Sequence, residues 1–376
     1  MKLKVAKNSF DKAIKSVAKA VPNKGVQPIL NNILLENENG HLVLNATDLD
    51  FSIEAIIPSE NIESGQITIS AKKLEEIVSK LDEDDIYLEV EEGTNKTNLT
   101  CKKSNFELVG ISAEDFPKAQ KPNTTNFIKL NKQQFSKMIN MTHFSSSKYD
   151  LNNILGGIYF QFTELDANKF LEIATTDGNR LSSYNYQLEE QVGSLEKTEL
   201  VVPAKVILDV QKIIESSVDD DVSISFLNNQ VVFFTQDRFI VSRLIDGSYP
   251  RYKQLIPRDQ DKLAQINTKQ FLSCLERVAT MANEITNLVK LTFKDNKLIV
   301  ESSNQDFGQA ADDMAIHYEG DPITIYFNVK YLIEPIKHID SEEITMTMSG
   351  NINPVLLKPS SSENYIHLVM PIKHDS

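Results

Sequence analysis

The chain has 376 residues, of which 41% are hydrophobic and 24% are charged, and its formal net charge is −14. This composition is typical of a folded protein of roughly two to three domains, and it excludes a disordered chain. A pI near 5.0 also excludes a simple nucleic-acid-binding protein with a basic surface throughout.

The cysteine and histidine content argues against metal and disulfide chemistry. Cys101 and Cys274 are too few for a disulfide framework or a four-ligand zinc site, and the six histidines show no metal-ligand spacing. The sequence has no Gly-rich phosphate loop and no nucleophile elbow. We therefore expect no cofactor, no metal and no catalytic residue. No apolar run reaches membrane-spanning length and the first residues lack a signal-peptide core, so we expect a cytoplasmic protein with no membrane partner.

An internal threefold repeat is the most informative feature of the sequence. Similar segments occur at residues 3–21, 128–144 and 264–282. Each has a short alternating strand, a polar corner and a Phe that begins an amphipathic helical pattern. The predicted buried stripes are Phe10, Ile14, Val17 and Val21; then Phe135, Ile139 and Thr142, a weaker pattern; and Phe271, Leu275, Val278 and Ala282.

The rest of each copy repeats in the same order: a strand, turn and strand, then a strand that continues into a second helix, then further strands. In chain order these segments are 41–54, 65–81 and 85–111; 170–184, 200–214 and 222–244; and 297–312, 323–339 and 343–370. Each copy is long enough to bury its own core, which is not true of short solenoid repeats. The sequence therefore predicts three α+β domains of one kind, at 1–125, 126–261 and 262–376.

Basic residues recur on the predicted helices although the chain is acidic. They are Lys12, Lys15 and Lys19 on the first helix, Lys72, Lys205 and Lys330 at the start of the second helices, Lys80, Lys212 and Lys337 two turns later, and Lys137 and Arg277 on the remaining helices. One interpretation is ordinary i, i+4 ion pairs, since Glu76, Asp209 and Glu334 follow the aligned lysines by four residues. Because all three copies share the pattern, we infer a surface with basic helices and acidic loops and strands.

Several motifs, taken in order, resemble the bacterial sliding clamp family, the beta subunit of DNA polymerase III. They are QPILNNILLE (27–36), ATDLD (46–50), EDFP (114–117), ATTDGNRL (174–181), RLIDGSYPRY (243–252) and LVMPI (368–372). The resemblance covers the whole chain. It implies the DNA clamp fold, in which a head-to-tail homodimer forms a closed six-domain ring, with helices lining the bore and sheets forming the wall. It also implies a non-catalytic processivity factor that encircles duplex DNA and is associated with the nucleoid.

The resemblance implies that the basic helices face DNA and contact phosphates without reading bases. The residues expected to contact DNA are Lys12, Lys15, Lys19, Lys24, Lys72, Lys80, Lys137, Lys148, Tyr149, Lys205, Lys212, Arg277 and Lys337. The implied protein partners are the DNA polymerase III alpha subunit, the clamp loader and other proteins with a clamp-binding motif.

The resemblance also implies one pocket for apolar-ended peptides between the second and third domains. Its matching positions are Leu155, Thr176, Gly178, Asn179, Arg180, Leu181, Pro250, Leu255, Ile352, Pro354, Val355, Leu368, Met370, Pro371 and Ile372. The apolar members suit a groove, and Thr176 and Arg180 suit the peptide's polar atoms. Plain core packing is the alternative for each apolar member. Asn179 replaces a common His, and Gln254 replaces a frequent basic residue, which puts the ranking of partner peptides in doubt.

The resemblance further implies a ring contact between edge strands of the first and third domains. Its expected residues are Lys96, Lys102, Lys103, Phe106 and Leu108 on one side, and Thr280, Met281, Asp306, Asp312 and Asp313 on the other. Thr280 is less apolar than is usual in the family, so we expect easier ring opening. Pro335 is expected to kink the last helix.

Two other functions compete with this interpretation. A nucleotide- or sugar-acting enzyme could use Asp48, Asp177 and Asn179, but Asp48 and Asp177 are equivalent positions of different repeats and suit capping of hairpin turns. The other alternative is a β-rich interaction scaffold that does not bind DNA. It predicts that the basic helices have no affinity for phosphate.

Overall fold

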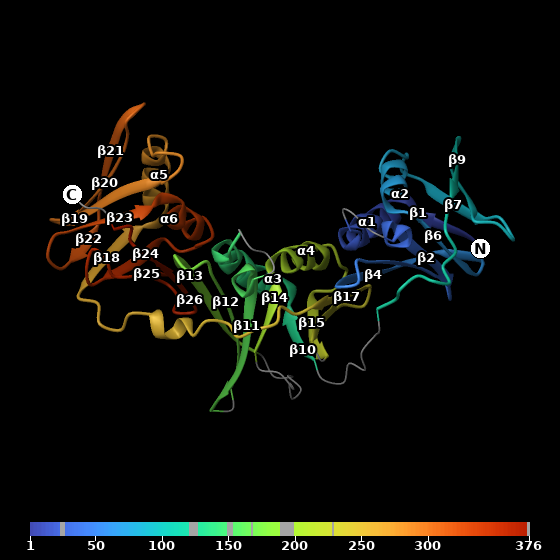
Figure 1. Cartoon of the computed structure of the whole chain (residues 1–376), viewed down its shortest axis with the longest axis horizontal. Helices are drawn as coiled ribbons and strands as arrows, with labels where there is room; N and C mark the ends of the chain where they lie inside the picture. The colour runs from blue at the N-terminus through green and yellow to red at the C-terminus, as the bar shows by residue number, and fades with distance from the viewer. Residues whose placement is uncertain are drawn as a thin grey trace. The chain divides into compact units, whose positions relative to one another are not determined.

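The computed structural model describes residues 1–22, 27–119, 127–148, 153–166, 168–188, 199–227 and 229–373 (Figure 1). These residues form two compact units. The described residues of unit 1 lie in 1–135 and 205–244, and those of unit 2 lie in 136–188, 199–204 and 245–373. The boundary passes through helix α3 (Lys132–Thr142), so the middle repeat contributes to both units.

Unit 1 contains two antiparallel sheets with the strand orders β5-β1-β7-β8-β9 and β10-β15-β16-β17-β4-β3-β2-β6. The strands are β1 (Lys2–Ala6), β2 (Asn32–Glu38), β3 (His41–Thr47), β4 (Phe51–Pro58), β5 (Glu60–Glu63), β6 (Gly65–Ser70), β7 (Asp85–Val90), β8 (Lys96–Cys101), β9 (Ser104–Val109), β10 (Ile128–Asn131), β15 (Asp221–Leu227), β16 (Gln230–Phe234) and β17 (Arg238–Arg243). Helices α1 (Lys7–Val17) and α2 (Ala71–Val78) pack against each other, and α4 (Ala204–Glu215) belongs almost wholly to this unit.

Unit 2 also contains two antiparallel sheets, with the orders β14-β11-β12-β13-β26-β25-β24-β18-β22 and β21-β20-β19-β23. The strands are β11 (Gly157–Leu165), β12 (Asn168–Thr176), β13 (Arg180–Gln187), β14 (Glu199–Pro203), β18 (Lys262–Asn267), β19 (Leu288–Lys294), β20 (Lys297–Asn304), β21 (Gly308–Ala315), β22 (His317–Glu319), β23 (Ile323–Asn328), β24 (Glu343–Met348), β25 (Val355–Pro359) and β26 (Tyr365–Val369). Helices α5 (Thr268–Ala279) and α6 (Val329–Ile336) pack together, and α5 contacts β20 and β21 (Figure 1).

The predicted strand and helix order of all three copies is confirmed, but two helices end earlier than expected. Phe10, Ile14 and Val17 are buried in α1, and the α-helix ends there. Val21 and Ala282 were placed on the buried stripes, yet both follow their helices and are only half-buried. A short 3₁₀ helix, Ala18–Ala20, replaces the last predicted turn of α1, because apolar periodicity does not determine where a helix ends.

Asparagine side chains cap the start of three helices. Asn131 and Asn267 lie in the polar corners predicted before α3 and α5, whereas in the first copy Ala6 precedes α1 without a side-chain cap. Asn131, Asn267 and Asn328 each accept a hydrogen bond from a backbone N–H two or three residues later, at 3.0 to 3.1 Å. An Asn at this position satisfies an otherwise unpaired donor of the first turn. The corner therefore fixes where each helix begins after its strand.

Two edge strands have equivalents in the other repeats that pair with each other. Strand β4 pairs with β17, and the equivalent strand β13 pairs with β26. In the remaining copy, the strand equivalent to β4 and β13 is β21, and the strand equivalent to β17 and β26 is β9. Both β21 and β9 lie at the end of their sheets.

Backbone hydrogen bonds fix the correspondence between β9 and β17. The amide of Gly110 donates to the Asn95 carbonyl at 2.8 Å, as the amide of Leu244 donates to the Asn229 carbonyl at 2.9 Å. The next residues repeat the match, since Ile111 and Ile245 donate to equivalent carbonyls at 3.0 and 2.8 Å. Phe106 therefore corresponds to Ile240, four residues earlier in each strand.

Candidate functional site

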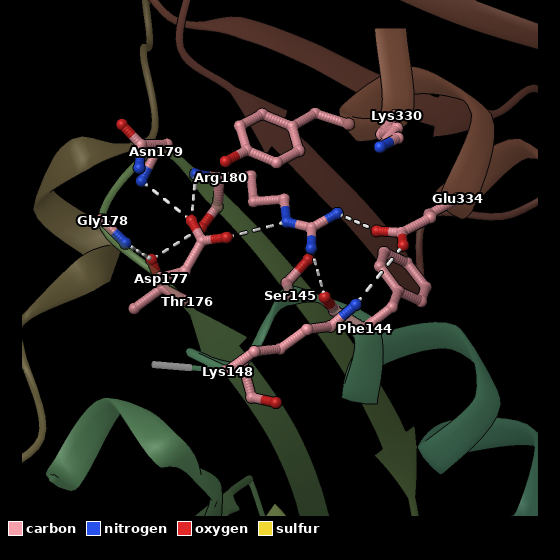
Figure 2. Close-up of polar contacts among 12 residues, drawn as sticks. Phe144, Ser145, Lys148, Thr176, Asp177, Gly178, Asn179, Arg180, Lys330 and Glu334 are labelled. Atoms are coloured by element: carbon pink, nitrogen blue, oxygen red, sulfur yellow. Dashed lines mark hydrogen bonds and ion pairs between the residues drawn. The ribbon is translucent and has the colours of Figure 1, made fainter. Parts of the chain in front are cut away.

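A tight hairpin turn in unit 2 carries several of the expected pocket residues (Figure 2). Asp177 lies between β12 and β13, and its Oδ1 accepts hydrogen bonds from the amides of Asn179 and Arg180 at 3.0 and 3.1 Å. Gly178 has φ of +90°, a left-handed conformation that favours glycine. The turn role expected for Asp177 is confirmed, and Asp48 caps the β3–β4 turn in the same way, at 3.0 and 2.7 Å.

Arg180 points inward from this turn rather than toward solvent, with 5% of its surface exposed. Its Nε donates to Asp177 Oδ2 at 3.0 Å, Nη1 donates to Glu334 of α6, and Nη2 donates to the Phe144 carbonyl. The guanidinium also lies over the ring of Tyr331, with Cζ 4.4 Å from the ring centroid. These contacts occupy the side chain that the sequence assigned to a peptide's polar atoms. A direct contact of Arg180 with a peptide stays a prediction.

Glu334 links this turn to an exposed lysine. Its Oε2 accepts the hydrogen bond from Arg180, while its Oε1 lies 3.7 Å from Lys148 Nζ (Figure 2). The Lys148 side chain is 69% exposed, whereas that of Arg180 is 4% exposed. One carboxylate thus binds an internal cation and a surface cation.

The expected pocket residues fall into two groups by exposure. Those that reach the surface, fully or in part, are Leu155, Gly178, Asn179, Pro250, Leu255, Ile352, Pro354, Met370, Pro371 and Ile372. Those that are buried are Thr176, Arg180, Leu181, Val355 and Leu368. Leu181 and Leu368 belong to one hydrophobic cluster of the unit 2 core, so core packing, the alternative considered for them, describes what they do in this structure.

The segment after β26 is held through its backbone to the hairpin turn and to β23. The Met370 amide donates to the Asn179 carbonyl at 2.9 Å, and the Ile372 amide donates to the Tyr326 carbonyl at 2.7 Å. The strand pair β4–β17, which is equivalent to β13–β26, has the same contact: the amide of Arg243 donates to the Asp50 carbonyl at 2.8 Å. Met370 is thereby held at the surface beside the turn.

Pro335 has a structural partner that explains its position in α6. A proline at this position cannot donate to the carbonyl of Tyr331, four residues earlier in the helix. His367 of β26 donates to that carbonyl instead, with Nε2 and the oxygen 3.0 Å apart, and its Nδ1 lies 2.9 Å from Ser182 Oγ. Because Tyr331 offers only an acceptor, the proton is on Nε2. Pro335 lies in the last turn of α6, and the carbonyl that it leaves free joins α6 to the strand before Met370.

Three tyrosines pack behind the exposed turn that contains Pro250. Tyr249 Oη accepts from the Thr176 amide at 3.0 Å and its ring stacks on Tyr159, with centroids 4.8 Å apart. Tyr252 donates to Glu172 at 2.5 Å. Burial raises the pKa of all three phenols above the ordinary value. They stay neutral at physiological pH and line a hollow of ≈ 420 Å³ that reaches Pro250 and Gln254.

The residues expected to contact DNA are mostly exposed. Those with exposed side chains are Lys12, Lys15, Lys72, Lys80, Lys137, Lys148, Lys205, Lys212, Arg277 and Lys337. Lys19 is half-buried and forms an ion pair with Asp209 at 3.4 Å. Lys24 and Tyr149 lie outside the described residues. Lys337 pairs with Glu276 of α5 at 2.9 Å.

The i, i+4 ion pairs considered within the second helices are wrong, because the three acids pair with other residues. Glu76 pairs with Lys73, Asp209 with Lys19, and Glu334 with Arg180 and Lys148. Asp209 and Glu334 pair with residues distant in sequence, because packing brings other elements beside their helices.

Four of the residues expected at the ring contact, Lys96, Lys102, Asp312 and Asp313, form ion pairs within their own unit. Lys96 pairs with Glu107 at 3.3 Å, and Asp313 pairs with Lys297 at 2.9 Å. Arg277 was assigned to DNA and Asp312 to the ring contact, yet Arg277 Nε donates to Asp312 at 2.8 Å because α5 packs on β21. Phe106 and Leu108 are half-buried, Lys102, Lys103, Thr280 and Asp306 are exposed, and Met281 is half-buried.

Comparisons with known proteins match the chain along its length. Family models for the N-terminal, central and C-terminal domains of the DNA polymerase III beta subunit match residues 1–120, 129–251 and 253–373. The chain belongs to the DNA polymerase III beta subunit family. A beta sliding clamp of Synechococcus elongatus is 31% identical, with 99% of each chain covered.

Solved structures agree with this assignment. A DNA polymerase III beta subunit from Eubacterium rectale is 30% identical and superposes with a TM-score of 0.91, with both chains fully covered. A sliding clamp from Pseudomonas aeruginosa bound to griselimycin is 26% identical, with a TM-score of 0.92 and full coverage of both chains. The chain is a DNA sliding clamp with the three α+β clamp domains expected from the repeat, and its family is a non-catalytic processivity factor.

In this sliding clamp the sequence interpretation missed the residues that contact Arg180 and so stabilise the Asp177–Arg180 turn. Phe144, Tyr331 and Glu334 contact Arg180, although Glu334 is 154 positions away in the chain. No local pattern predicts such contacts. The motif around Tyr249 pointed to the site, but its hydrogen bond to Thr176 depends on folding.

No helix among the described residues is long and apolar enough to cross a membrane. In the same residues, no group of three or more His, Cys, Asp or Glu side chains is arranged to hold a metal ion.

Acid is expected to destabilise the clamp through His367. Burial lowers the pKa of His367 to about 3, below its ordinary value of 6.5. Between about pH 6.5 and 3, His367 is therefore protonated in the unfolded chain but neutral in the folded chain. The free energy of unfolding then falls as the pH drops through this range, by up to about 1.4 kcal/mol per pH unit. Urea unfolding at stepped pH values should give a shallower pH slope for His367→Gln than for the parent. Equal slopes in the two proteins would contradict the neutral, buried state of His367.

Proposed function

We propose that two copies of this chain form a closed head-to-tail ring around duplex DNA. The observation that carries the proposal is the pair of edges β9 and β21. Their equivalents are joined at both junctions within the chain, as β17 with β4 and β26 with β13. An edge with unpaired backbone groups is satisfied by another strand, and two such contacts between two copies close a ring.

The repeat gives this contact a definite register. Asn304 accepts from the amide two residues later, as Asp48 does, so these two turn residues are equivalent. Ala46 and Ile53 pair across the first hairpin as Ser302 and Ala310 pair across the third. Since Ile53 faces Ile240, and Phe106 corresponds to Ile240, Phe106 should face Ala310 of the second copy. Both residues are half-buried in the single chain.

The remaining proposed assignments concern DNA, location and domains. The exposed lysines of the helices would contact phosphates weakly and without sequence preference, which permits sliding. Lys24 and Tyr149 remain in this set as sequence assignments. The domain boundaries 1–125, 126–261 and 262–376 and a cytoplasmic, nucleoid-associated location are part of the proposal.

The surface residues of the expected pocket would bind apolar-ended peptides of the polymerase alpha subunit, the clamp loader and other partners. Leu255 and Ile352 are each 61% exposed, and Met370 is 37% exposed. Exposed apolar side chains gathered at one surface are typical of a peptide-binding groove, and of these three Met370 is bound directly to the turn. The buried members, Leu181, Val355 and Leu368, would support the groove from below.

Paired cysteines should trap the ring in the predicted register. The pair Phe106→Cys and Ala310→Cys should form a disulfide between copies. The backbone bonds of Arg243 to Asp50 and of Ile56 to Asp237 place the equivalent pair Ile240 and Ile53 at a non-hydrogen-bonded position, where side chains are closest. Native Cys101 and Cys274 are buried, and burial raises the pKa of both thiols, so they should stay inert.

Non-reducing gel electrophoresis would show a covalent dimer for this pair. The pair Phe106→Cys with Ala311→Cys is the control, since adjacent strand residues point to opposite faces. A monomer from the first pair, or equal crosslinking by both pairs, would refute the register.

Replacing an exposed groove residue should weaken peptide binding without unfolding the chain. Leu255→Ser should reduce the affinity for a labelled peptide ending in Leu-Phe by roughly 10-fold or more, because burial of a leucine contributes about 1.5–3 kcal/mol. Fluorescence anisotropy would measure this loss. Leu165→Ser is the control, because Leu165 is 65% exposed and lies at the far turn of β11 and β12. Equal affinity of both variants would remove Leu255 from the site.

Topological linkage to DNA tests the function itself. After loading, the clamp should stay on a nicked circular duplex through a salt wash and leave once the circle is linearised, because a ring is held by topology rather than affinity. Gel filtration of labelled clamp with each DNA would report retention. Equal retention on both forms would indicate ordinary DNA binding. Retention on neither form would favour a scaffold that does not meet DNA.

A further inference from the structure

Glu334 lies between two residues that the proposed function assigns to different ligands. Its Oε2 binds Arg180, which holds the turn of Asp177 to Asn179, and its Oε1 lies 3.7 Å from Lys148 Nζ. A continuous chain of charged contacts therefore runs from the peptide-side turn to a lysine assigned to phosphate (Figure 2).

The two cations share this carboxylate, each at its own oxygen, and they differ in exposure. Arg180 is enclosed by Tyr331 and Phe144, whereas the side chain of Lys148 is largely exposed. A phosphate near Lys148 offers the lysine a second anion, which draws its charge away from Glu334. The full charge of Glu334 then acts on Arg180, and charge-assisted hydrogen bonds strengthen with that charge.

We propose that Glu334 couples phosphate binding at Lys148 to peptide binding at the Asp177–Arg180 turn. DNA at Lys148 strengthens the Glu334–Arg180–Asp177 contacts and further restricts the turn that they hold, so an apolar-ended peptide loses less conformational entropy on binding. The coupling is reciprocal, and bound peptide raises the affinity for DNA by the same factor. This inference rests on the proposed peptide and DNA sites.

The chain offers a matched control for Glu334. Glu276 of α5 pairs with Lys337 at 2.9 Å, and Lys337 is another residue assigned to phosphate. Both Glu334→Gln and Glu276→Gln remove one negative charge beside such a lysine, but among the described residues Glu276 forms no hydrogen bond or ion pair with Arg180. A general electrostatic effect on DNA affinity would therefore appear in both variants.

The experiment measures the affinity of the full-length chain for a labelled peptide ending in Leu-Phe, with and without a short DNA duplex at low salt. We expect the duplex to raise peptide affinity about 5-fold in the parent chain and in Glu276→Gln. The increase should disappear in Glu334→Gln. Thermal unfolding of Glu334→Gln checks that it folds, since glutamine still accepts a hydrogen bond from Arg180.

Lys148→Gln provides a second measurement that does not disturb the buried contacts. Without the lysine, Glu334 acts on Arg180 alone, so this variant should bind the peptide without DNA as tightly as the parent does with DNA. Equal enhancement in Glu334→Gln and the parent, or no enhancement in the parent, would overturn the coupling alone. No peptide binding by the parent would overturn the proposed peptide site as well.

Discussion

A buried guanidinium is the constraint on which the candidate site of this clamp depends. Arg180 is almost fully enclosed, and an unpaired charge in that position would strongly destabilise the fold. The structure meets this requirement with a carboxylate on each side, a backbone carbonyl and an aromatic face. The same contacts fix the turn that carries Gly178 and Asn179, so what satisfies the charge also shapes the surface.

The same principle explains Pro335, which removes a donor inside a helix. The freed carbonyl of Tyr331 is satisfied by His367, whose other nitrogen lies within hydrogen-bond distance of Ser182. A helix, the turn strand β13 and the strand before Met370 are thus joined through one buried imidazole. Unpaired polar groups in the interior are costly, and here their partners come from elements far apart in sequence.

The net charge of −14 describes the whole chain and hides its distribution. The exposed helix positions carry lysines in each of the three repeats, while many acids lie in strands and loops. Several acids nonetheless reach the helices and pair with these cations, as Glu334, Asp209 and Glu276 do. The basic surfaces are therefore partly neutralised within the chain, and a phosphate must compete with internal carboxylates.

The sequence by itself determined the order of strands and helices, the threefold repeat and the turn roles of Asp48 and Asp177. These follow from local periodicity and from turn chemistry that acts over a few residues. Exposed groove residues such as Leu255 could be named from the family resemblance. Tertiary structure alone decided that Arg180 is internal, that Arg277 binds Asp312, and that Val21 and Ala282 lie beyond their helices. The first two depend on which distant element packs alongside, because a buried charge selects its partners only once the chain has brought them together. The helix ends are not determined by apolar periodicity.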